Sequence, residues 1–113
     1  MPMIDVLALG EEHLALAREN PHGRSAHTFL REGPLRQAII ALTAGSALGE
    51  HEAPPAASLH VLSGRVRIMD EEGAIGLATG QIAPIPLLRH SLEADEDSVV
   101  VLTTVVDLAS GAG

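Results

Sequence analysis

The stretch LGEHEAPPAASLHVLSGRV, residues 48–66, contains two histidines, His51 and His60, where a metal site would need several donors that point to one place. The chain has no cysteine, so any bound transition metal would depend on histidine and carboxylate ligands. Glu50 and Glu52 flank His51, but adjacent side chains of an extended strand point to opposite faces. His60 has the opposite parity to its apolar neighbours, which predicts that it faces outward. His51 therefore needs partners from elsewhere in the chain.

Other catalytic arrangements are not signalled by the residues. The serines and threonines do not stand in a nucleophile-elbow pattern, and the glycines do not form a phosphate-binding loop that opens a helix. A histidine could act as a general base, because imidazole titrates near neutral pH and needs only correct placement. The histidines are thus the side chains on which a chemical function would depend.

One helix and a series of strands must position these histidines. Residues 5–19 carry apolar side chains at helical spacing, with Asp5 as the N-cap, and the breaker sequence Asn-Pro-His-Gly follows. Short apolar runs of strand length come next, separated by glycine, proline or charged turns. These runs are residues 25–30, 35–43, 58–63, 65–70, 74–79 and 98–108.

The turns and the last run indicate how the strands are arranged. Tight hairpins are expected at residues 63–64 and 71–73, and the acidic segment 93–98 is expected to be a solvated hairpin. Residues 98–108 are apolar on both parities, which predicts a central strand covered on both faces. A chain of 113 residues is long enough for one compact core, so we expect a single domain.

The sequences HEAPPAASLHVLSGRVRI and ATGQIAPIPLLRHSLEA, in this order, resemble the two conserved motifs of the cupin superfamily. The matching positions cover about residues 35–106 and are Gly45, His51, Gly64, Gly80, Pro84, Pro86 and His90. The resemblance implies an all-β fold, a double-stranded β-helix (cupin) barrel or jelly-roll-like sandwich with a short N-terminal helix. The single cupin domain would span residues 1–113, with the helix at about 5–19 and the barrel at about 24–107.

The resemblance also implies a metal-ligand set that this chain retains only in part. Carried over by position, the second histidine of the His-x-His pair falls on Ala53, and the glutamate falls on Ala57. His51 and His90 remain of the usual four ligands, and His27 is the candidate for a third. With three ligands the site would suit Fe, Mn, Ni or Zn, whereas two histidines alone favour no cofactor.

Two functions stay open, and with them the question of whether the chain is an enzyme. In the first, the barrel binds a small molecule without a full metal site, with His51 and His90 as its polar groups. The walls expected for this apolar pocket are Ile39, Ala41, Leu59, Val61 and Val101. In the second, resembling the metal-dependent cupin enzymes, the same two histidines are metal ligands in a dioxygenase, isomerase or decarboxylase. Two neutral, hydrogen-bonded histidines without either function are the structural alternative.

Charge and composition limit the classes of molecule that the chain is expected to bind. Seven arginines, no lysine and fifteen acidic residues give a net charge of −8, so nucleic acid and anionic membranes are not expected to bind. The first twenty residues lack the pattern of a signal peptide or membrane span, which favours a cytoplasmic location. The apolar N-terminal helix and the strand at 25–30 leave surface and edge to cover. We expect a homodimer with the N-terminal segment in its interface.

Overall fold

A computed structural model describes residues 3–51, 56–85 and 90–106, with only the backbone described at positions 50 and 51. The N-terminal helix α1, Val6–Glu19, matches the helix predicted from the sequence. Its N-cap is Asp5, whose carboxylate accepts hydrogen bonds from the backbone N–H groups of Leu7 and Ala8 at 3.0 and 3.1 Å. Within the described residues, no helix is long and apolar enough to cross a membrane.

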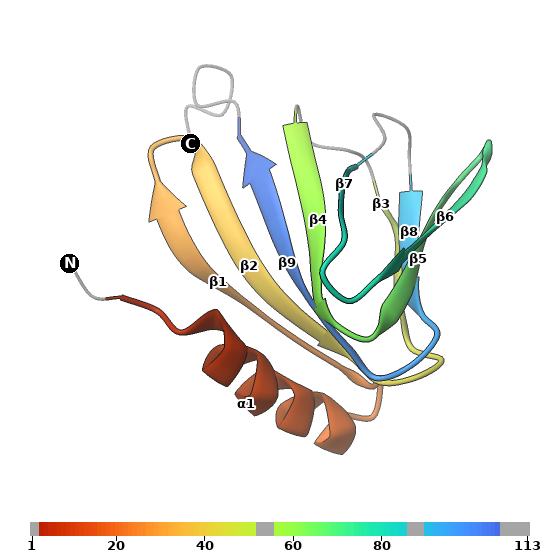
Figure 1. The fold of residues 1–113 in the computed structure, drawn as a ribbon, viewed down its shortest axis with the longest axis horizontal. Coiled ribbons are helices and arrows are strands. Elements are labelled where there is room, and N and C mark those ends of the chain that lie inside the picture. The colour runs from red at the N-terminus through yellow and green to blue at the C-terminus, as the bar shows by residue number, and fades with distance from the viewer. Residues whose placement is uncertain (1–2, 52–55, 86–89, 107–113) are drawn as a thin grey trace.

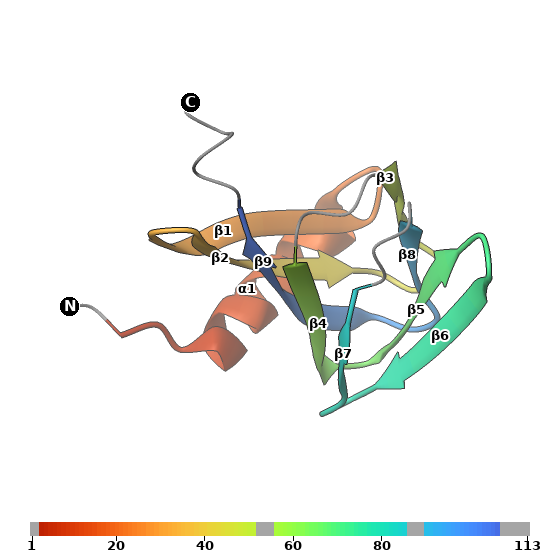
Figure 2. The ribbon, with the colours of Figure 1, turned by 90° about the horizontal axis from the view of Figure 1, so that it is seen from above.

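Nine strands follow the helix and form two antiparallel sheets (Figures 1 and 2). The strands are β1 (Arg24–Glu32), β2 (Leu35–Leu42), β3 (Ala47–His51), β4 (Ala56–Ser63), β5 (Arg65–Asp70), β6 (Gly73–Ala78), β7 (Ile82–Pro84), β8 (His90–Ala94) and β9 (Ser98–Val105). One sheet has the order β1-β2-β9-β4-β7, and the other has the order β3-β8-β5-β6. The predicted all-β fold with one short helix is confirmed, and β9 is the central strand of the larger sheet.

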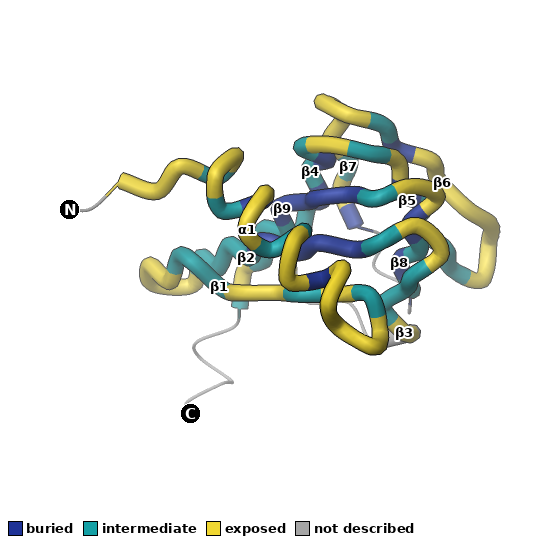
Figure 3. The backbone as a smooth tube through the Cα atoms, turned by 90° about the horizontal axis from the view of Figure 1, so that it is seen from below, coloured by how far each residue is buried: buried dark blue, intermediate teal, exposed yellow. Residues whose placement is uncertain are grey.

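Two hydrophobic clusters hold these layers together. The larger cluster fills the barrel interior with side chains of both sheets, among them Leu42, Val61, Val66 and Val100. The second lies between α1 and the outer face of the five-stranded sheet. Figure 3 shows buried stretches along the strands beneath the helix and exposed stretches on the helix and outlying turns. Strand β9 contributes alternate residues to the two clusters, so it is covered on both faces as predicted.

The assignment of β2 and β9 side chains to the barrel interior was wrong at three positions. Ile39, Ala41 and Val101 pack in the cluster beneath α1. Their neighbours Ile40 and Val100 face the interior instead. Since successive side chains of a strand alternate between faces, choosing the other parity moves every wall residue from one cluster to the other.

Two of the predicted hairpins connect different sheets. The turn between β4 and β5, at Gly64, leads from the five-stranded to the four-stranded sheet. The acidic turn between β8 and β9 leads back from the four-stranded to the five-stranded sheet. Only the β5–β6 turn among the three closes a hairpin, with Asp70 opposite Gly73. Crossing between sheets rather than folding back is what wraps the strands around a common interior.

The acidic turn also fixes the helix to the barrel. Asp97 accepts a hydrogen bond from the backbone N–H of Ala44 at 2.9 Å and forms an ion pair with Arg18 of α1 at 3.0 Å. The Ala44 hydrogen bond, helped by the Arg18 guanidinium, lowers the pKa of Asp97 below its usual 3.8. The carboxylate therefore contributes to stability while it is ionised.

Candidate functional site

His90 is the only buried ionisable side chain among the described residues, at 5% exposure. It is the first residue of β8, where buried and half-buried residues alternate, and its parity directs it into the barrel with Leu92 and Ala94. It lines an interior cavity of about 20 Å³. The other lining residues are aliphatic: Ile40, Leu48, Leu59, Ile68, Ile85, Leu92 and Leu102. Among the described side chains that line this cavity, the imidazole of His90 is thus the one polar group.

His51 lies directly across from His90 in the β3–β8 pair. The register between these strands shifts between Leu48 and His51, so a β-bulge or similar irregularity precedes the pair. The backbone therefore brings together the two histidines that the sequence singled out, while the side chain of His51 lies outside the described part.

The remaining predicted pocket residues are divided between the two faces of the sheet. Leu59 and Val61 of β4 belong to the interior cluster, and Leu59 lines the cavity beside His90. Ile39, Ala41 and Val101 lie beneath the helix, as described above. Interior walls that the sequence did not identify are Ile40, Leu48, Ile68, Ile85, Leu92 and Leu102.

His27 is held away from the barrel interior. It is exposed on β1 opposite Ile39, a residue of the cluster beneath α1. Its ring stacks on the ring of His13, with centroids 5.8 Å apart. His13 in turn shares a hydrogen bond of 2.7 Å between its Nδ1 and the hydroxyl of Ser25. The structure thus places the candidate third ligand with the helix, on the opposite face of the sheet from the side chain of His90.

The described donor set does not fit a cupin metal centre. In the described part of the chain, no group of three or more histidine, cysteine or carboxylate side chains could hold a metal ion. Ala57, at the position that the resemblance assigns to the glutamate ligand, packs its methyl group against the interior cluster. Ala53 lies outside the described residues. Since stable transition-metal sites take three or four protein ligands, His51 and His90 alone are too few.

The interior cavity limits what could enter it. A water molecule needs about 10–15 Å³ of such space, and sites for drug-sized ligands are roughly 300–1,000 Å³. At about 20 Å³, the cavity next to His90 accommodates one water-sized group. The imidazole can donate one hydrogen bond and accept another when it is neutral. The aliphatic side chains among the described lining residues suit a neutral polar atom better than a charged group.

Comparison with solved structures places this architecture in a known fold. A conserved protein of unknown function from Streptococcus pyogenes is 25% identical, with a TM-score of 0.69 over 78% of each chain. A cupin-2 domain protein from Shewanella frigidimarina is 16% identical, with a TM-score of 0.68 over 91% of this chain and 94% of the other. Salicylate 1,2-dioxygenase from Pseudaminobacter salicylatoxidans is 14% identical, with a TM-score of 0.75 over 87% of this chain but 33% of the enzyme.

These similarities define the class of protein as a double-stranded β-helix barrel. The chain has the fold of a small cupin domain, as the two sequence motifs indicated. Neither protein-family models nor curated proteins gave a match. Proteins of unknown function are among the solved structures that it resembles, and no specific role follows from the fold.

Proposed function

We propose that this cupin-fold chain binds a small molecule at the barrel end where His51 and His90 are paired, without a complete metal-ligand set. The observation that carries the proposal is His90, a buried imidazole at 5% exposure that lines an otherwise aliphatic cavity. A few polar groups that orient a ligand in apolar surroundings are typical of small-molecule sites. His51 would supply the second polar group, since it is the cross-strand neighbour of His90.

The chemistry of the cavity narrows the ligand class. Its volume of about 20 Å³ admits a terminal oxygen or hydroxyl of the ligand, while the rest of the molecule would lie toward His51. An anionic head group would lose its hydration among aliphatic side chains, and no arginine is among the described residues that line the cavity. We therefore favour a neutral ligand with an alcohol, carbonyl or amide oxygen at one end.

A metal-dependent enzyme, such as a dioxygenase, isomerase or decarboxylase, is the second candidate. Its support is the fold shared with salicylate 1,2-dioxygenase, together with the pairing of His51 and His90. The methyl group of Ala57 in the interior cluster weighs against it. A third ligand would have to come from outside the described side chains.

A thermal-shift screen of neutral and anionic metabolites, performed with a chelator present, tests the proposal. A ligand at 100 times its Kd stabilises the folded state by about 2.7 kcal/mol, which raises the Tm of a domain of this size by roughly 10 °C. The shift should be lost in His90→Leu and His51→Ala but kept in His60→Ala, because His60 pairs with Val101 on the outer face.

The outcomes separate the two candidate functions. A ligand response that needs added metal and disappears with chelator would favour the enzyme. A neutral ligand whose shift survives in both His90→Leu and His51→Ala would show that it binds elsewhere. The Tm of each variant is measured first without ligand, so that a loss of folding is not mistaken for a loss of binding.

A further inference from the structure

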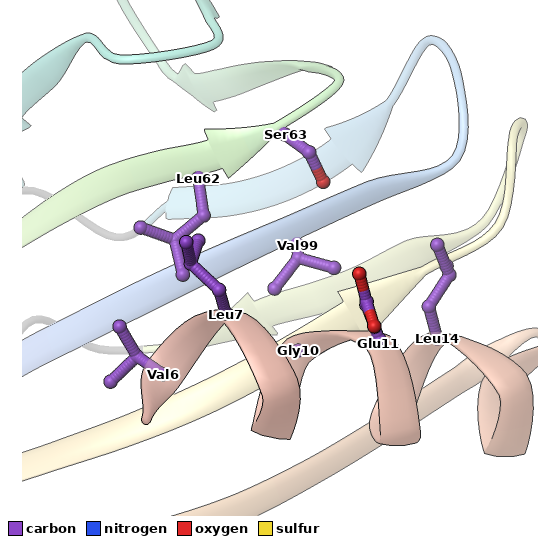
Figure 4. Close-up of a pocket in the computed structure, with 8 residues that line it drawn as sticks. All are labelled: Val6, Leu7, Gly10, Glu11, Leu14, Leu62, Ser63 and Val99. Atoms are coloured by element: carbon purple, nitrogen blue, oxygen red, sulfur yellow. The ribbon is translucent and has the colours of Figure 1, made fainter. Parts of the chain in front are cut away.

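A shallow groove of about 190 Å³ lies between α1 and strands β4 and β9, outside the barrel interior (Figure 4). Gly10 and Val99 are the buried residues among those that line it. Since Gly10 has no side chain, the helix approaches β9 so closely that an added Cβ would lie 2.8 Å from Val99 Cγ1. Leu7 of the helix and Leu62 of β4 also line the groove, so its inner surface is aliphatic.

Two polar side chains lie at the edge of this aliphatic surface. The Glu11 carboxylate is on the side of α1, and the Ser63 hydroxyl is on the side of β4 (Figure 4). Both residues are exposed, and within the described part of the chain neither side chain has a hydrogen-bond or ion-pair partner. Arg18, two helical turns after Glu11, is paired with Asp97 at 3.0 Å. Glu11 is thus the one charged residue among the described residues that line the groove, and its carboxylate is available to a ligand.

We propose that this groove is a second ligand site, separate from the barrel end with His51 and His90, and that it binds alkylammonium ions, which are small organic cations with an aliphatic body. The alkyl chain packs on Val99 inside the groove. The ammonium group, which has three N–H donors, donates hydrogen bonds to the Glu11 carboxylate and the Ser63 hydroxyl. This ligand class differs from the neutral class proposed for the barrel, so the two sites can be tested separately.

The size and charge of the groove determine this ligand class. An engineered cavity of about 150 Å³ in another protein binds benzene, so a groove of about 190 Å³ suits an alkyl chain of roughly six to eight carbons. The net charge of −8 attracts cations and repels anions. A neutral ligand of the same length would leave the Glu11 carboxylate without the stronger, charge-assisted hydrogen bond that an ammonium group provides. A cation with an apolar body matches both the aliphatic surface and the carboxylate.

Amide NMR spectra of the full chain, titrated with hexylammonium at neutral pH, test the proposal. We expect saturable shifts at the amides of Gly10 and Val99, with a Kd on the order of 1 mM. 1-Hexanol should bind about tenfold more weakly, and hexanoate should cause no saturable shift at these amides. Each buried methylene strengthens binding about fourfold, so the affinity should rise about 15-fold from butylammonium to hexylammonium. The increase should stop once the chain is longer than about eight carbons, because the groove is then full.

Two neighbouring glutamates provide a matched pair of variants. Glu11→Gln removes the charge and keeps the size of the side chain, so it should weaken hexylammonium binding about tenfold. Glu12→Gln is the control, because Glu12 is the next residue of the same helix, is exposed and does not line the groove. It should change the Kd by less than about twofold. Glutamine and glutamate have similar helix propensities, so both variants should fold like the wild type.

Three results would overturn the proposal. Equal effects of Glu11→Gln and Glu12→Gln would show that the net charge of the protein attracts the cation and that the groove does not select it. Equal affinities for hexylammonium and 1-hexanol would show that the Glu11 carboxylate does not contribute to binding. Saturable shifts that leave Gly10 and Val99 unchanged would place the cation on another part of the surface.

Discussion

Replacing Gly64 with alanine is expected to destabilise the protein more than the same substitution at Gly45. Both glycines have positive φ angles, 94° at Gly64 and 83° at Gly45, where a Cβ costs roughly 1–2 kcal/mol. Their surroundings differ. At Gly45 an added Cβ would meet no described atom within 4 Å. At Gly64 it would lie 2.7 Å from Ser98 Cα and still closer to the Ser98 hydroxyl and the Asp97 carbonyl oxygen.

The close contact at Gly64 adds a second cost to the unfavourable φ. Two of the three nearest atoms are backbone atoms, so the turn must move away from Ser98 to relieve the overlap. The buried Ser98 hydroxyl accepts a hydrogen bond from the backbone N–H of Arg65 at 3.0 Å across this turn. Such a hydrogen bond contributes about 1 kcal/mol, and a polar group left unsatisfied costs more. We expect a loss of roughly 3 kcal/mol for Gly64→Ala and about 1 kcal/mol for Gly45→Ala.

Urea unfolding of the two variants and the wild type, at one protein concentration, measures the difference. Comparison of midpoints at a common m-value should give about 2 kcal/mol between the variants, or roughly 10 °C in Tm. Equal losses within about 0.5 kcal/mol would show that the crowding at Gly64 has no energetic effect. In that case close packing against Ser98 would not be the reason for a glycine at position 64.

Two further substitutions test the packing and the helix attachment. Leu59→Ala should lower the free energy of unfolding by about 2–5 kcal/mol, because Leu59 is 1% exposed and lines the cavity. Ile75 is 46% exposed, so Ile75→Ala should change the free energy of unfolding by less than about 1 kcal/mol. Similar losses for the two variants in urea unfolding would contradict the assignment of Leu59 to the core. Asp97→Asn should be destabilising at neutral pH, because the Ala44 hydrogen bond and the Arg18 ion pair favour the ionised carboxylate and lower its pKa. The loss in free energy of unfolding relative to wild type should be fully present above pH 3.8 and should shrink as the pH falls through the lowered pKa of Asp97. If urea titrations show a loss that stays constant down to about pH 2, the ionised Asp97 carboxylate is not its cause.

The helix and the long strands could be predicted because their signals are local. Asp5 caps a helix whose apolar residues recur at helical spacing, and the predicted and observed ends agree closely. The strand β9, Ser98–Val105, is apolar on both parities, and this pattern correctly indicated a strand covered on both sides. In each case the residues themselves contain the information that determines the element.

The short strands and the choice of interior face depend on distant parts of the chain. Strand β7 has three residues and ends at Pro84, so its only strand signal is its pairing with β4. Strand β8 carries polar residues between its buried ones and lies between β3 and β5. Ile39 and Ile40 are equally apolar, so only the packing of α1 determines which of them faces the interior.

In the candidate site, too, some features could be predicted from the local sequence and others depend on distant parts of the chain. The motif resemblance identified His51 and His90, which the structure pairs across β3 and β8. His27 could be proposed as a further ligand because strand parity gives no absolute direction. Its position beside His13 depends on where the helix docks, which the sequence around His27 does not specify.

Counting metal per chain in untagged protein, purified without a metal-affinity column, tests the central claim most directly. The measurement is repeated after incubation with Fe, Mn, Ni or Zn and removal of the excess. If the barrel end with His51 and His90 binds a small molecule without a complete metal site, the content should stay far below one ion per chain in both preparations. A near-stoichiometric metal that is lost in both His51→Ala and His90→Ala would contradict this account and establish a metal centre.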